Sequence, residues 1–173
     1  AARGFYASEL KNPFRMATLP AMDQGGTTFL SLNSEYIKAI VPVPATQFGT
    51  HGVIVITDQN AYATYGNLAS DLSRLSRISS YGSLSPYSAV EHKGVLYYLD
   101  ADMQLRYVSG GASQPLSRGR VDDILAGIPG GRRQYVTSCF HNETLYLGYT
   151  PSAGSSNSKV LVWDAEGNAF TTD

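Results

Sequence analysis

A β-hairpin can be read directly in residues 94–108, whose sequence is GVLYYLDADMQLRYV. Two runs rich in Val, Leu and Tyr flank the polar segment 100–103, and these residue types pack well on a pleated sheet. Two such runs joined by a polar turn of a few residues are typical of antiparallel strands. The aspartate that opens the turn can bond the backbone that follows it, so its presence needs no metal.

The same arrangement of strand, polar turn and strand occurs again at residues 53–66 and 159–172. Four strand-like cores, each starting on a small or polar residue, begin near Arg3, Gly52, Gly94 and Glu143. Their spacing of about 40–50 residues is the length of one four-stranded blade of a β-propeller. The sequence therefore predicts an all-β fold of repeated antiparallel hairpins with β-propeller-like blades, as a single domain or propeller portion over residues 1–173.

Composition agrees with this fold class. The chain has 173 residues, 43% of them hydrophobic and only 16% charged, with 12 tyrosines. Cys139 is the single cysteine, so the chain can form no internal disulfide, which fits a protein assembled inside a cell. Cys139 lies in the apolar run 135–140, and we predict that it is a small core residue. No apolar run approaches the length of about 20 residues that a membrane-spanning helix needs.

Helix is expected to be scarce. Residues 120–126 favour one or two helical turns, stopped by Gly127 and Pro129, and residues 71–75 favour another single turn. Residues 151–158 are expected to be a loop between two strands. The chain begins in a strand-like segment without an initiating Met, which we interpret as a fragment or a processed product.

The charge pattern gives one weak pointer to a site. The net charge is −1, and no basic stripe of the kind that binds phosphate backbones is present. A small group of arginines is the exception, and we interpret it as part of an ordinary solvated loop, with contact to an anion or a DNA path as the alternative. The group consists of Arg118, Arg120, Arg132 and Arg133.

Motifs for metal binding are incomplete. Asp100 and Asp102 have the spacing that opens a calcium loop, but Gln104 follows and the required glycine is missing. His51, His92 and His141 lie at similar points of successive repeats, without an acidic partner that repeats with them. We predict no metal and no cofactor.

Motifs for catalysis are incomplete as well. Asp122 and Asp123 are adjacent and point in different directions, so we expect them to cap or solvate a short helix rather than to act as acid and base. The chain contains no phosphate-binding loop and no Gly-x-Ser-x-Gly elbow. We predict that the protein is not an enzyme.

The region around the third repeat resembles the structural β-propellers of tailed phages, such as tail-nozzle and head-to-tail stabilisation proteins. The resemblance is carried by residues 78–90, ISSYGSLSPYSAV, followed by 94–100 and by Leu105-Arg106-Tyr107. Residues 53–58 with 62–66 look like the preceding blade, and residues 3–9, RGFYASE, with Asn12-Pro13 look like a further unit. Nozzle proteins are much longer, so this chain would correspond to a portion of one.

The resemblance implies a non-catalytic virion component, assembled in the host cytoplasm, that packs by propeller surfaces in a ring around the DNA path. Its partners would be further copies and other tail proteins, with non-specific proximity to DNA, no membrane and no small-molecule substrate. Two other functions remain open. One is a carbohydrate-active or carbohydrate-binding propeller, although no Ser-x-Asp-x-Gly-x-Thr-Trp box occurs. The other is a general protein-interaction propeller, because fold alone does not fix function.

Overall fold

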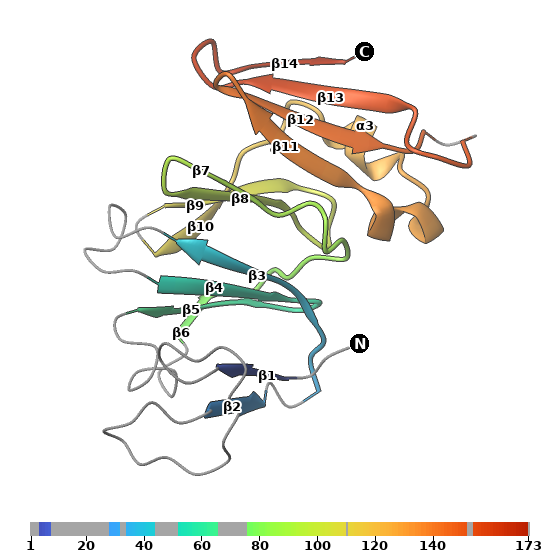
Figure 1. The fold of residues 1–173 in the computed structure, drawn as a ribbon. Helices are drawn as coiled ribbons and strands as arrows, with labels where there is room; N and C mark the ends of the chain where they lie inside the picture. Colours follow the sequence, from blue (N-terminus) through green and yellow to red (C-terminus); the bar gives the residue numbers. More distant parts are fainter. Residues whose placement is uncertain are drawn as a thin grey trace.

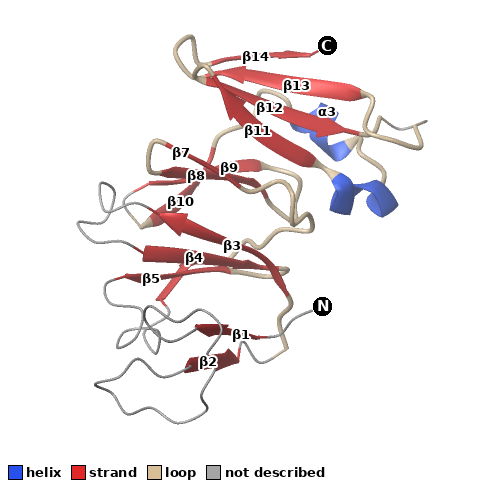
Figure 2. Cartoon of the chain, viewed as in Figure 1, coloured by secondary structure: helices blue, strands red, loops and turns tan. Residues whose placement is uncertain are grey.

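The computed structural model describes residues 4–7, 28–31, 34–43, 52–65, 76–109, 111–151 and 154–172, with only the backbone of residues 4–7, 28–31 and 65. Antiparallel β-structure dominates these residues (Figures 1 and 2). None of the described helices has the length and apolar character needed to cross a membrane. The fold class predicted from the sequence, all-β with repeated antiparallel hairpins, is confirmed.

Three four-stranded sheets follow one another along the chain. Sheet A contains β3 (Ile37–Val43), β4 (Gly52–Thr57), β5 (Ala61–Tyr65) and β6 (Ser76–Ser79). Sheet B contains β7 (Val90–His92), β8 (Val95–Leu99), β9 (Leu105–Ser109) and β10 (Ala112–Pro115). Sheet C contains β11 (Thr137–His141), β12 (Thr144–Tyr149), β13 (Lys159–Asp164) and β14 (Ala169–Thr172). A separate pair joins β1 (Gly4–Ala7) to β2 (Thr28–Ser31).

Each sheet is a meander in which strands that are neighbours in sequence are neighbours in space. The three predicted hairpins are present as β4–β5, β8–β9 and β13–β14. The predicted strand cores at Gly52, Gly94 and Glu143 correspond to β4, β8 and β12, which are second strands. Each sheet therefore starts one strand earlier than the repeat suggested, at β3, β7 or β11.

The sheets stack as layers, with sheet B in the middle (Figure 1). Successive residues of β8 point to opposite faces. Leu96 and Tyr98 join the core shared with sheet A, whereas Leu99 and the half-buried Tyr97 join the core shared with sheet C. Sheet B is thus covered on both sides, which explains why its central strand reads as a nearly continuous apolar run. The first strands also lie close together, because β7 contacts both β3 and β11.

Among the residues that the structure describes, helical structure lies in the link between sheets B and C. The predicted short helix is confirmed as α3 (Asp122–Ala126), and it places Leu125 in the core. A 3-10 helix, η1 (Gly130–Tyr135), follows it and was not predicted. The turn expected at residues 71–75 lies outside the described residues.

The core prediction for Cys139 is wrong, because its side chain is exposed. In β11 the residues alternate, and it is Ser138 and Phe140 that are turned inward, with Phe140 against the core. The apolar run of residues 135–140 therefore did not reveal which side chains of β11 are turned toward the core.

Candidate functional site

The first candidate surface is the face of sheet C that points away from sheet B. In β12, Leu145 and Leu147 are buried in the core, and Tyr146 between them points the other way. The register places Tyr146 between Cys139 and Val162, with Thr171 next to Val162. We call this side of the sheet the outer face. Its members are Thr137, Cys139, His141, Thr144, Tyr146, Gly148, Val160, Val162, Asp164, Ala169 and Thr171.

The outer face carries almost no charge. Asp164 is its single ionisable carboxylate, and this side chain is already engaged at the β13–β14 turn, where it accepts the backbone N–H groups of Glu166 and Gly167. Neither core cluster of the described residues includes a member of the outer face. A sheet face this poor in charge is unusual for a surface that stays in water.

The outer face of sheet C is structurally equivalent to the face of sheet B that packs on sheet C. The turns β7–β8 and β11–β12 match, since Lys93, Gly94, Asn142 and Glu143 all have positive φ. His92 pairs with Val95 and His141 with Thr144.

His141 therefore occupies in sheet C the place that His92 occupies in sheet B, and Tyr146 occupies the place of Tyr97. In sheet B both positions are used for packing. His92 stacks on Phe140 at 4.3 Å between ring centroids, and Tyr97 lies 4.9 Å from Phe140.

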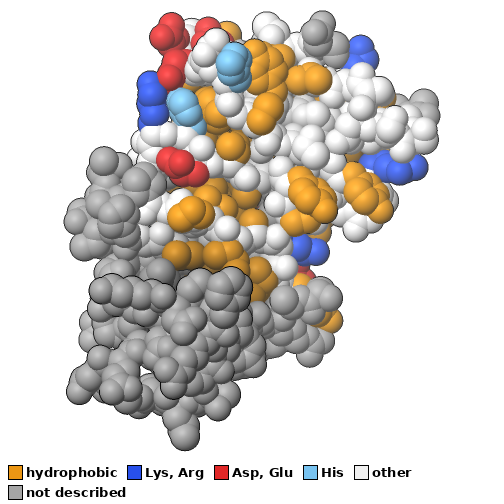
Figure 3. Space-filling view, in the orientation of Figure 1, with side chains coloured by type: hydrophobic (Ala, Val, Ile, Leu, Met, Phe, Trp, Pro, Cys, Tyr) orange, Lys and Arg blue, Asp and Glu red, His pale blue; other side chains and the backbone are white. Residues whose placement is uncertain are grey.

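An ion cluster borders the junction between sheets B and C. His92 Nε2 lies 3.1 Å from Glu143 Oε2, and Lys93 Nζ lies 2.6 Å from Glu143 Oε1. Hydrogen bonds from Lys93 and then His92 lower the pKa of Glu143. Both hairpin ends lie on one side of the molecule, where Figure 3 shows histidine, acidic and basic side chains close together.

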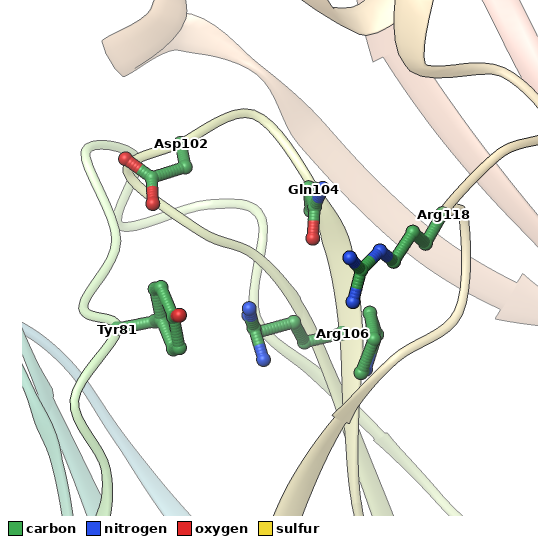
Figure 4. A pocket seen from close by; sticks show the side chains of 6 residues that line it. Tyr81, Asp102, Gln104, Arg106 and Arg118 are labelled. Carbon is green, nitrogen blue, oxygen red and sulfur yellow. The ribbon is translucent and has the colours of Figure 1, made fainter.

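The second candidate is a pocket at the far end of sheet B, with a volume of about 380 Å³ (Figure 4). It lies between the segment that follows β6, the β8–β9 turn and the chain beyond β10. We call it the arginine pocket. It is lined by Tyr81, Asp102, Gln104, Arg106, Pro115 and Arg118.

Arg106 is the most constrained residue of the arginine pocket. It is 6% exposed, and its Nε donates to Oδ2 of Asp100, which is 1% exposed. Its Cζ lies 3.7 Å from the ring centroid of Tyr81, in a cation–π contact. Burial raises the pKa of Asp100, while the Gln104 backbone N–H and Arg106 act in the opposite direction. The Asp100 turn predicted from the sequence is confirmed, since Oδ1 accepts the backbone N–H of Gln104 at 2.8 Å.

The arginine pocket includes one of the four arginines singled out from the sequence, Arg118. Arg120 instead donates to Asn168 Oδ1 at 2.7 Å, and Arg133 donates to the carbonyl of Ile128 at 3.2 Å. Arg132 lies in η1, away from the pocket lining. The residue that the sequence reasoning missed is Arg106. The sequence feature that could have identified Arg106 is its position in an otherwise apolar strand, directly after a turn that begins with an aspartate.

The other candidate residues named from the sequence belong to neither the outer face nor the arginine pocket, apart from His141 and Asp102. His51 is outside the described residues. Asp122 and Asp123 lie in the first turn of α3, but no side chain of the described residues caps this helix by a hydrogen bond, and Asp122 Oδ2 instead accepts the backbone N–H of Gly119 at 2.7 Å. Within the described parts of the chain, no three His, Cys, Asp or Glu side chains come together as a metal site would require.

The comparisons with known proteins add no identification. No model of a known protein family matches the sequence, and a search among curated proteins finds no match.

Proposed function

We propose that this chain is a non-catalytic assembly module whose sheets act as propeller-like blades and whose outer face binds a second copy of the chain. One observation carries the proposal. The outer face places His141 and Tyr146 where sheet B uses His92 and Tyr97 to pack on the next sheet. A further sheet laid on the outer face would continue the stacking that already joins sheet B to sheet C.

A second copy is the occupant that this repetition favours, because each copy offers sheets of the same kind. The contact would join different surfaces of two copies, and head-to-tail contacts of this type close into rings when the rotation permits. The resemblance to tail-nozzle and head-to-tail proteins suggests a phage tail as the setting, with a ring around the DNA path. The scarcity of charge on the outer face favours a dry contact over a DNA contact.

Light scattering over a range of protein concentrations tests the proposal, together with the reactivity of Cys139. This thiol is exposed on the outer face, so it should react readily in dilute protein and become protected as the mass rises. Tyr146→Asp and Thr171→Asp should each abolish both effects, because an unpaired charge in a dry contact is costly. Tyr87→Asp is the control, since Tyr87 is 62% exposed and lies outside this face.

A chain that remains monomeric at every concentration, with Cys139 equally reactive throughout, contradicts self-association. Protection of Cys139 by a different tail protein alone would also contradict it, and would assign the outer face to that partner.

Carbohydrate binding is a second candidate, favoured by one groove of about 300 Å³. Its lining includes Tyr87 and Tyr135, which are 62% and 50% exposed, together with the side chains of Lys38 and Gln134. Aromatic faces next to polar donors suit the apolar and hydroxyl faces of a sugar ring. A glycan-binding screen with the wild type and Tyr87→Ala tests this candidate, which fails if no glycan binds in a Tyr87-dependent way.

A further inference from the structure

We propose that the arginine pocket binds the carboxylate of an acidic side chain on a polypeptide partner. The inference does not depend on self-association, because the arginine pocket shares no residue with the outer face. It starts from Arg106, whose Nε is held by Asp100 and whose plane is held against Tyr81. Among the described residues, the side-chain hydrogen bond of Arg106 uses Nε, and its Nη groups are not among the fully buried atoms, so they can still be reached from the pocket.

The surroundings of Arg106 keep its guanidinium in one orientation. The hydroxyl of Tyr98 donates to the backbone carbonyl of Tyr81 at 3.0 Å, and the backbone N–H of Tyr81 donates to Ser79 Oγ at 3.1 Å. Tyr81 is thereby fixed on one side of the guanidinium, and Asp100 is fixed at Nε. A preorganised donor loses little conformational entropy on binding, and the free Nη edge matches the two oxygens of a carboxylate.

Arg118 supplies the second cation. It is exposed on the segment beyond β10, and Figure 4 shows it reaching toward Gln104 and Arg106 from the side opposite Tyr81. No ion pair joins Arg118 to an acidic side chain among the described residues. An anion between Arg106 and Arg118 would therefore have a cationic side chain on each side.

Asp102 determines which anion fits. Its carboxylate stands at the rim on the Tyr81 side, so it repels a phosphate that carries two charges (Figure 4). A carboxylate with a neighbouring N–H donor suits both ends of the pocket, since the N–H can be accepted by Asp102. An aspartate or glutamate within a peptide has this arrangement, and a free acetate ion does not.

The test is a titration of the whole protein followed by proton–nitrogen correlation spectra. The signals to follow are the Nε–H of Arg106 and the backbone amide of Gln104. The probe is N-acetyl-aspartic acid N-methylamide, compared with its asparagine counterpart, sodium acetate and inorganic phosphate at equal ionic strength. The aspartate probe should give saturable shifts, acetate weaker ones, and the asparagine probe none.

Arg118→Gln should weaken binding of the aspartate probe by about tenfold, the loss expected for one charge-assisted hydrogen bond. The matched control is Arg132→Gln, which should bind as the wild type does. Asp102→Asn should leave the protein folded and allow phosphate to bind.

Shifts that grow linearly and equally for all salts would overturn the proposal and leave Arg106 a purely structural residue. Equal binding of acetate and the aspartate probe would overturn the peptide assignment, and tighter binding of phosphate to the wild type would overturn the carboxylate assignment.

Discussion

The imidazole of His92 lies flat on the ring of Phe140, with the two planes 1° apart and the centroids separated by 4.3 Å. The two residues belong to the hairpin ends of different sheets, β7–β8 and β11–β12. Phe140 also meets Trp163 edge-on at 6.4 Å, so the stack continues into the core between sheets B and C. On the side away from the core, the stack ends where His92 Nε2 contacts Glu143 Oε2.

Replacing Glu143 with Gln should reduce stability in a way that depends on pH. Because the pKa of Glu143 is lowered in the folded protein, its contribution is present above the pKa of the unfolded chain and is lost as the pH falls through the folded value. Urea unfolding of both proteins from neutral to acidic pH measures this. A difference between them that stays constant as the pH falls would contradict the role of the charge.

Removing the carboxylate of Asp100 should destabilise the protein strongly. Asp100→Ala leaves the buried Arg106 without its ion partner, a type of loss that costs about 3–5 kcal/mol. Asp102 is two residues away but exposed, so Asp102→Ala should change the free energy of unfolding by about 0.5 kcal/mol or less. Chemical denaturation of the two variants gives both values, and equal losses would refute the distinction.

Gly82 should not tolerate a side chain. A Cβ at this position would overlap the backbone of Thr57, Asp58 and Gln59, which belongs to the β4–β5 turn of sheet A. Gly82→Ala should therefore cost about 2 kcal/mol, as expected for overpacking against rigid backbone.

The control for this substitution is Gly130→Ala, because a Cβ at Gly130 meets nothing within 4 Å. It should leave the thermal midpoint nearly unchanged. If the two alanine variants have the same thermal midpoint, the segment around Gly82 is able to move away from the β4–β5 turn.

Tyr62 should titrate at unusually high pH. Burial, followed by the hydrogen bond to Glu35 Oε1 at 2.7 Å, raises its pKa to about 12. Because the folded pKa is above the unfolded value of about 10, the stability from Tyr62 is complete below about pH 10 and is lost as the pH rises to about 12. Comparing the unfolding free energy of the wild type and Tyr62→Phe across this range measures the loss. A difference that does not change in alkali would contradict it.

Much of the β-structure was predictable because strands and tight turns depend on neighbours in sequence. The alternation and polar turn of residues 94–108 identified β8 and β9, and Gly127 with Pro129 identified the end of α3. The first strands of sheets A and B, β3 and β7, were missed. β7 has three residues, Val90, Glu91 and His92, whose strand character comes from pairing with β8 and not from their own pattern.

The candidate sites were predicted less well, because they join residues from distant parts of the chain. Four arginines close in sequence gave one pocket residue, Arg118, whereas Arg106 and Tyr81 meet through the packing of sheet B on the segment that follows sheet A.

The local pattern of apolar residues, glycines and aspartates thus established strands, turns and the all-β class by short-range physics, since side-chain alternation and turn conformations need only adjacent residues. Tertiary structure decided which face of each sheet is buried. Cys139 and Phe140 are adjacent and both apolar, yet Phe140 packs against Tyr97 and Trp163 while Cys139 stays exposed. That choice arises because one face of sheet C meets sheet B, and burial by a neighbouring layer is a long-range property that no single strand encodes.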